Sequence, residues 1–194
     1  MSGQTITTRA VIFDCFGVLT ESTYKKFYAH YLHNDPEKIQ EAKRLDHLAN
    51  MGTLSTEGLN YQFAALANIS VGELQAFISQ YYANTELLDY IAAHLKPRYK
   101  IGFLSNVASD LMDTLFTVDQ QAIFDDVLLS YQVGMAKPAA EIFQLSAARL
   151  KVQPEECIFV DDIQQYCDAA RAQGMRAITY NDFQDFKAEL EALL

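Results

Sequence analysis

The feature of this sequence that most constrains its fold is an alternation of short apolar runs with segments of helical spacing. The runs are residues 10–14, 100–105, 127–130, 157–161 and 177–180. A strand buried on both faces of a sheet reads as a continuous apolar run, so each run predicts a parallel strand. Helical spacing follows at 109–116, 139–150, 164–173 and 182–193. This order predicts an α/β fold with a parallel, doubly wound sheet.

Residues 20–84 interrupt this alternation, because they contain helix signals and no convincing strand. Asp35 before Pro36, Ser55 and Ser70 each precede a segment of helical spacing, as helix-capping residues do, and the last predicts a helix over 71–82. Asn84 is placed to cap the helix that returns to the sheet. The sequence thus predicts an all-helical insert at 20–84, between core segments 1–19 and 85–194. Within the core, Ser109 is expected to cap the helix at 109–116.

The charge balance limits the possible partners. Twenty-five acidic and 15 basic residues give a formal charge of −10, which disfavours nucleic acid and anionic membranes. We find no apolar stretch near the ~20 residues of a membrane helix and no signal-peptide core in residues 1–9. Three cysteines without a CxxC pattern favour a reducing compartment, so we expect a cytoplasmic protein. Nothing in the sequence indicates an oligomeric state.

Polar side chains follow the predicted strands at the points where those strands end. Because the carboxyl ends of parallel strands meet at one edge of a sheet, these side chains are expected to lie together. The set contains a carboxylate after the first run, a hydroxyl with a neighbouring amide after the second, a lysine after the third and paired acids after the fourth. They are Asp14, Ser105, Asn106, Lys137, Asp161 and Asp162.

This set of groups suits a displacement reaction on an anionic substrate. Asp14 can attack a phosphorus or a carbon atom and form a covalent intermediate. Mg²⁺ bound by carboxylates and waters would reduce the repulsion between like charges. Lys137 and Ser105 would neutralise and orient the transferred group, and Asn106 is expected to contact the substrate as well.

Four stretches make the chain recognisable. FDCFGVL, FLSN, GMAKP and FVDD followed by AARAQGM occur in the order and at the spacing typical of the haloacid dehalogenase-like (HAD) hydrolase superfamily, which the chain resembles over essentially its full length. The resemblance implies a Rossmann-like core with a helical cap inserted after the first motif. It implies Asp14 as nucleophile, Ser105 as phosphate-binding hydroxyl and Lys137 as charge-stabilising cation.

The same resemblance implies a magnesium site. By this resemblance Asp162 corresponds to the direct Mg²⁺ ligand and Asp161 to a ligand through water, and Asp14 belongs to the metal site as well. The main-chain carbonyl of Phe16 would complete the metal shell whatever its side chain. Read from the sequence alone, Asp161 and Asp162 could equally cap the helix that follows them.

Phe16 departs from the phosphatase pattern. Family phosphatases usually carry an aspartate two residues after the nucleophile, as acid for the leaving group and base for the second step. Phenylalanine can do neither, and a positioned acid or base contributes about 10²–10⁴-fold to rate. Dehalogenase members of the superfamily have an aromatic residue there, but they need no metal and do not normally keep the acid pair. Residues 18–24 also lack an arginine for a substrate carboxylate.

The sequence therefore predicts a Mg²⁺-dependent phosphatase that acts on a small phosphorylated metabolite through an aspartyl-phosphate on Asp14. One alternative is a weak or inactive binding or regulatory protein on a hydrolase scaffold, and a further one is a 2-haloacid dehalogenase. A residue of the cap could replace the missing acid, and the candidates are His30, His33, His47 and Glu21. The tyrosines of the cap are interpreted as packing residues, and Cys15 as a buried small hydrophobe.

Overall fold

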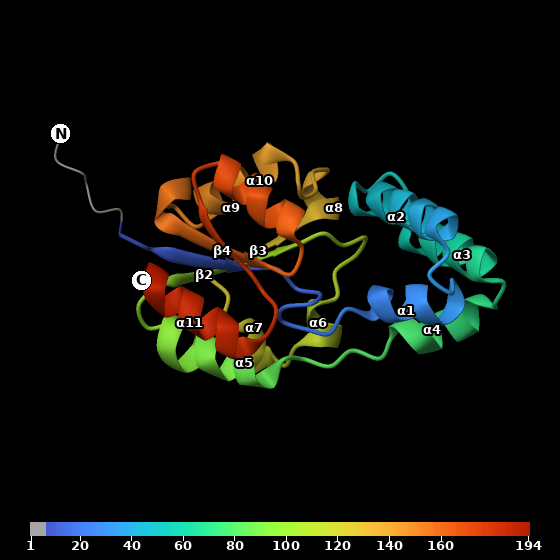
Figure 1. The fold of residues 1–194 in the computed structure, drawn as a ribbon, viewed down its shortest axis with the longest axis horizontal. Helices are drawn as coiled ribbons and strands as arrows, with labels where there is room; N and C mark the ends of the chain where they lie inside the picture. The colour runs from blue at the N-terminus through green and yellow to red at the C-terminus, as the bar shows by residue number, and fades with distance from the viewer. Residues whose placement is uncertain (1–6) are drawn as a thin grey trace.

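The computed structural model describes residues 7–194 and is built on a five-stranded parallel sheet (Figure 1). The strand order is β3-β2-β1-β4-β5, so the first strand lies in the centre. Every neighbouring pair is parallel, which confirms the predicted α/β class. The strands are β1 (Ala10–Phe13), β2 (Lys100–Ser105), β3 (Asp126–Leu129), β4 (Cys157–Asp161) and β5 (Arg176–Thr179).

Helices cover both faces of the sheet, as a doubly wound fold requires. The helices drawn below the sheet in Figure 1 cover one of its faces. They are α5 (Thr85–Tyr90), its π-helical continuation Ile91–Leu95, α6 (Met112–Leu115), α7 (Val118–Gln121) and α11 (Phe183–Leu193). The other face packs under α8 (Ser130–Val133), α9 (Ala140–Arg149) and α10 (Gln164–Ala172), and a 3₁₀ turn (Pro154–Glu156) precedes β4. Alternate residues of β1 supply the two cores, with Val11 and Phe13 in the first and Ala10 and Ile12 in the second.

The strand predictions agree with the structure to within one residue at each end. One helix start was wrong. Ser109 does not cap a helix at 109–116, because the helical turn begins only at Met112, where the Asp110 side chain accepts a hydrogen bond from the Met112 amide at 2.9 Å. The N-cap position falls on Leu111, which makes no side-chain cap hydrogen bond, and Asp110 stabilises the turn just before it.

Residues 20–84, which we call the cap, contain four helices that share an apolar cluster of their own. Asp35, Ser55 and Ser70 each accept a backbone hydrogen bond at the start of a helix, as predicted. The fourth helix ends at Ile78, so the prediction of a helix over 71–82 was too long. The helices are α1 (Thr23–Tyr31), α2 (Pro36–Asn50), α3 (Thr56–Ala67) and α4 (Val71–Ile78).

The two chain segments that join the cap to the core run side by side. Thr20 forms an antiparallel bridge with Ala83, and the Asn84 amide donates to the Leu19 carbonyl at 2.8 Å. The residues after α4 join this pairing, since the Tyr82 carbonyl accepts a backbone hydrogen bond from the Glu21 amide, and they form no further helical turn. The cap is thereby held next to the carboxyl end of β1.

Among the helices described, we find none with the length and apolar character needed to cross a membrane.

Candidate active site

The centre of the site is a lysine that bridges two carboxylates. Lys137 Nζ lies 2.6 Å from Asp14 Oδ1 and 2.6 Å from Asp161 Oδ2. Asp14 follows β1 directly and Asp161 ends β4, the adjacent strand, so the sheet itself brings the two acids together. Lys137 reaches them from the loop that follows α8. The convergence predicted for these three residues is therefore observed.

Neighbouring groups hold Lys137 in place. The Asn106 amide exchanges two hydrogen bonds with the Lys137 backbone, donating to its carbonyl and accepting from its N–H, each at 2.9 Å. The ammonium lies 5.4 Å from the centre of the Phe159 ring and 5.1 Å from that of Tyr166, within the range of cation–π attraction. Asn106 lines the cleft, but its amide is already engaged in positioning the lysine.

Burial sets the electrostatics of the bridge. It raises the pKa of the Asp14 carboxyl to about 7, and Lys137 opposes this rise. Burial also raises the pKa of Asp161, again opposed by Lys137. Burial alone lowers the pKa of an ammonium, but the two carboxylates raise the pKa of Lys137 above its ordinary value, so it stays charged. The cation thus makes two closely spaced acids tolerable in a buried site.

A third carboxylate makes a divalent cation site chemically plausible. Asp14, Asp161 and Asp162 each offer an oxygen, and these oxygens lie within 4.8 Å of one another. Asp162 Oδ1 is buried and has no hydrogen-bond partner among the described residues. A buried acceptor without a partner is costly, and hard carboxylate oxygens are what Mg²⁺ prefers. The donor set therefore fits the metal that the resemblance implied.

Two residues of the chain stand next to Asp162. Lys25 of α1 lies with Nζ 2.6 Å from Asp162 Oδ2, which joins the cap to the core by an ion pair. Gly17 has φ +96°, and a Cβ at this position would collide with the Asp162 carboxylate. The glycine is therefore required both by its backbone conformation and by the close approach of the acid.

Ser105 ends β2 and is fully buried. Its Oγ has no hydrogen-bond partner within residues 7–194. Asp161 Oδ1 accepts a hydrogen bond from the Ile163 amide at 2.9 Å. Ile163 itself holds the N-cap position of α10 and the helix has no side-chain cap, so the alternative role of the two acids as helix caps was wrong.

Phe16 lies on the wall of the cleft beside the cap. Its ring centre is 6.0 Å from that of Tyr81, so an apolar contact occupies the place of the expected acid. The residues predicted from the sequence as substitutes for this acid do not line the cleft. None of the three histidines is among the described residues that line it, and neither is Glu21, which pairs with Lys26. Those candidates were wrong.

Cys15 is buried in the core, as predicted, and burial raises the pKa of its thiol.

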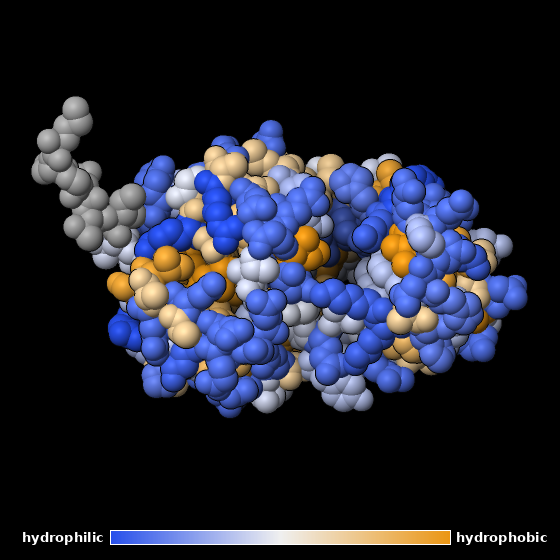
Figure 2. Space-filling model, in the orientation of Figure 1, coloured by the Kyte–Doolittle hydropathy of each residue, from blue (hydrophilic) through white to orange (hydrophobic). Residues whose placement is uncertain are grey.

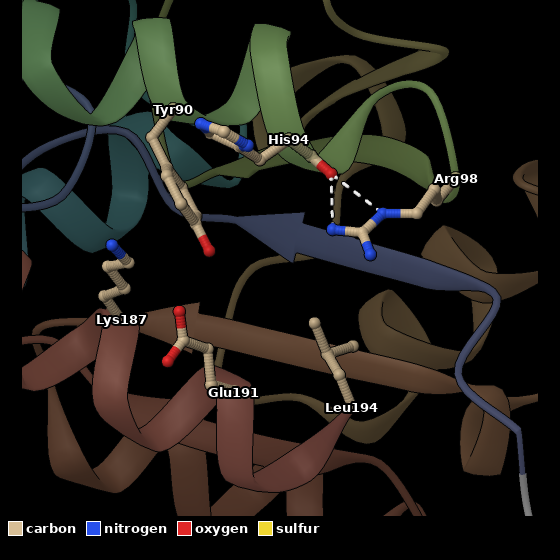
Figure 3. A pocket seen from close by; sticks show the side chains of 6 residues that line it. All are labelled: Tyr90, His94, Arg98, Lys187, Glu191 and Leu194. Carbon is tan, nitrogen blue, oxygen red and sulfur yellow. Dashed lines mark hydrogen bonds between the residues drawn. The ribbon is translucent and has the colours of Figure 1, made fainter.

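The site opens into a cleft of about 780 Å³ between core and cap, visible as a hollow between the two parts in Figure 2. Core residues Asp14, Lys137 and Asp162 and cap residues Tyr24 and Asp46 line it. A second pocket of about 360 Å³ lies between α5 and α11 (Figure 3). It contains no residue of the four motifs, so the chemistry is assigned to the larger cleft.

Fold and site together define a protein with a doubly wound parallel sheet and a carboxylate at the end of its central strand. The sequence model of the haloacid dehalogenase-like hydrolase family matches residues 8–174. The chain therefore belongs to this family and is a hydrolase, which confirms the resemblance carried by the four motifs.

Relatives named as phosphatases extend the comparison. The phosphorylated carbohydrates phosphatase of Thermotoga maritima is 26% identical over 94% of this chain and 90% of its own length. The D-ribitol-5-phosphate phosphatase of Bacteroides thetaiotaomicron is 31% identical over 55% of each. A HAD family enzyme of B. thetaiotaomicron, solved with magnesium and inorganic phosphate, superposes with a TM-score of 0.68 at 23% identity, covering 90% of this chain and 94% of that one.

Other relatives match over a small part of their length. Bifunctional epoxide hydrolase 2 of Sus scrofa is 38% identical over 35% of this chain, and the match spans 12% of that protein.

Two cleft residues were missed by sequence reasoning. Lys25 stands beside Lys26 in the sequence, and nothing in that pair points to a strand end of the core. Asp46 was not singled out, although a signal was available: on α2 it lies four residues from Ala42 and Asn50, both buried. A carboxylate on the apolar stripe of a helix is a candidate for a functional group.

Proposed function

We propose that this hydrolase is a Mg²⁺-dependent phosphatase of small phosphorylated metabolites, with residues 20–84 as a cap domain over its active site. The observation that carries the proposal is the Asp14–Lys137–Asp161 bridge, with Asp162 beside it, on the floor of a cleft large enough for a metabolite. The names of the relatives support phosphate esters as substrates, and the neighbour solved with magnesium and phosphate supports the metal.

Asp14 acts as the nucleophile. One of its carboxylate oxygens attacks phosphorus, the bond from phosphorus to the ester oxygen breaks, and the alcohol leaves with the bonding electron pair. Water then attacks the phosphorus of the aspartyl-phosphate, which releases inorganic phosphate and restores Asp14.

Lys137 places positive charge beside Asp14 during both steps, and Ser105 offers its unpartnered hydroxyl to the transferred group. Bound Mg²⁺, held by Asp14, Asp161 and Asp162, would supply further positive charge for the phosphoryl oxygens. Phe16 supplies no proton, so the leaving alcohol takes its proton from water, and esters with acidic leaving groups should react fastest.

A phosphate-release assay tests the proposal, with p-nitrophenyl phosphate and a panel of metabolite phosphates as substrates. We expect release that needs Mg²⁺, stops with chelator and falls to background in Asp14→Asn. Release that is unchanged in Asp14→Asn would contradict the assignment of the nucleophile. Halide release from a 2-haloacid in chelator would favour the dehalogenase alternative instead.

The contact of Phe16 with Tyr81 favours a second candidate, a binding or regulatory protein that keeps phosphate affinity without useful turnover. Tight binding of a phosphate mimic without turnover of any ester would support this candidate. Rapid turnover of any phosphate ester would exclude it.

A further inference from the structure

The cap wall of the cleft carries a carboxylate that the proposed reaction does not use. Asp46 lies on α2 and lines the same cleft as Asp14. Its Oδ2 accepts a hydrogen bond from Asn50 Nδ2 at 2.8 Å. Within the described part of the chain, no basic side chain forms an ion pair with it. Asp46 therefore has hydrogen-bonding capacity left over for a ligand.

Two aromatic rings of the cap line the cleft together with this carboxylate. Tyr24 and Tyr28 stack with ring centres 6.3 Å apart, and both line the cleft. Burial raises the pKa of Asp46 to about 6, so the group is mostly ionised at neutral pH despite its surroundings. An unpaired carboxylate in such a place costs folding free energy, and groups of this kind concentrate at functional sites.

One cleft joins the reaction centre to this cap carboxylate. Asp14, Tyr166 and Asp46 all line it, and its volume is about 780 Å³. A ligand that binds at Asp14 with one end can therefore extend along the same cleft toward Asp46.

The amides on the cap wall indicate what kind of group binds there. Asn34 and Asn60 line the cleft, and neither side chain has a hydrogen-bond partner within residues 7–194. An amide offers both donors and an acceptor, and a hydroxyl group also donates and accepts. An ammonium group only donates, and Lys43, which lines the same wall, would repel it. Hydroxyl groups match the wall better.

We propose that Asp46 is a specificity-determining residue that accepts hydrogen bonds from hydroxyl groups of the substrate, so that the preferred substrates are phosphate esters of polyols or sugars. This inference rests on the proposed phosphatase function and adds its substrate class. The tyrosine rings pack against the C–H faces of the carbon chain, and the amides of Asn34 and Asn60 contact further hydroxyl groups. The phosphate lies at the Asp14 end.

The experiment compares two esters of similar length, ribitol 5-phosphate and n-pentyl phosphate, which has no hydroxyl group. We expect the wild-type protein to prefer ribitol 5-phosphate at least tenfold in kcat/KM, chiefly through KM. Asp46→Ala should reduce that ratio to near one. Glu41→Ala is the matched control, because Glu41 lies on the same helix and pairs with Arg44 outside the cleft, and it should keep the ratio.

A merely structural role for Asp46 would lower kcat/KM for both esters alike and leave their ratio unchanged, which would overturn the inference. A wild-type ratio near one would overturn it too. If Asp46→Ala does not fold, Asp46→Asn replaces it, because an asparagine still accepts from Asn50 while the charge is removed.

A binding measurement separates this inference from the proposed function. If the wild-type protein releases no phosphate from any ester, the proposed function fails and titration calorimetry on Asp14→Asn decides the inference. Tighter binding of ribitol 5-phosphate than of n-pentyl phosphate, lost in Asp14→Asn/Asp46→Ala, supports it. Equal binding of the two esters overturns it.

Discussion

Lys25 of the cap and Asp162 of the core form an ion pair of 2.6 Å on one of the carboxylates that a metal ion would use. The lysine side chain is 69% exposed, whereas that of Asp162 is 7% exposed. Lys25 holds Oδ2, whereas Oδ1 is the buried oxygen without a partner in the described part of the chain. A metal that binds through Oδ1 therefore lies close to a second positive charge, that of the Lys25 ammonium.

We predict that Lys25→Met binds Mg²⁺ more tightly than the wild type, because the neighbouring ammonium is gone. Exposed ion pairs contribute about 0.2–1 kcal/mol, which corresponds to a gain of roughly 1.4- to fivefold in affinity. Titration calorimetry with MgCl₂ measures it. Lys26→Met is the control, since Lys26 pairs with Glu21 away from the metal carboxylates. Equal or weaker Mg²⁺ binding by Lys25→Met would argue against repulsion between the ammonium and the metal.

Phe16→Asp should restore the missing acid. If the rest of the site is competent, we expect kcat for alkyl phosphates to rise by about 10²–10⁴-fold. The gain should be smaller for p-nitrophenyl phosphate, whose leaving group needs no proton. Phe16→Asn is the control, because it removes the ring from Tyr81 without adding an acid. A gain of the same size in Phe16→Asn would assign the effect to space in the cleft and not to proton transfer.

Gly17→Ala should displace Asp162 and weaken Mg²⁺ binding. The added Cβ would collide with the Asp162 carboxylate, and alanine at φ +96° is strained as well. Gly134→Ala separates the two effects, since Gly134 has φ +64° but a Cβ there meets nothing within 4 Å. Calorimetry of Mg²⁺ binding should therefore show a loss in Gly17→Ala alone. An equal loss in both variants would point to backbone strain.

Lys137→Met should abolish phosphate release and destabilise the fold at neutral pH. Removing the cation leaves Asp14 and Asp161 buried without an opposite charge, which costs about 3–5 kcal/mol. Urea unfolding measures the loss. Lys96→Met, which breaks a half-exposed pair with Asp125, should cost less than about 1 kcal/mol.

The loss in Lys137→Met should depend on pH. Lys137 lowers the pKa of both carboxyls, so its removal raises the pKa of Asp14 above about 7 and raises that of Asp161 further. As the pH rises through about 7, the folded variant keeps protons that the folded wild type has released, so its stability falls relative to that of the wild type. We expect the deficit to grow as the pH rises above about 7 and to be smaller at lower pH. A deficit independent of pH would indicate lost packing instead.

The core of the site was predictable from the sequence because its geometry follows from strand order. An apolar run ending in Asp14 and another ending in Asp161 predict two buried parallel strands, and their carboxyl ends meet at one edge of the sheet. Lys137 was predicted to join these acids because it is the one cation that follows the end of a third predicted strand. The observed bridge of 2.6 Å on each side agrees with that prediction.

The cap was predictable only as a set of helices. Capping residues such as Asp35 and Ser70 act on their own backbone neighbours, so their effect is visible in the sequence. The length of α4 was not, because the residues that follow it pair instead with a distant segment, where Tyr82 accepts from Glu21, 61 positions away in the chain.

The sequence by itself thus determined the fold class, the family and the group of acids and lysine at the strand ends, since these depend on local apolar patterning and on motifs. Only the tertiary structure placed Lys25 on Asp162, packed Phe16 against Tyr81 and put Asp46 on the wall facing the reaction centre. These relationships depend on how the cap packs against the core. That packing sums many weak long-range contacts, which no local pattern in the chain encodes.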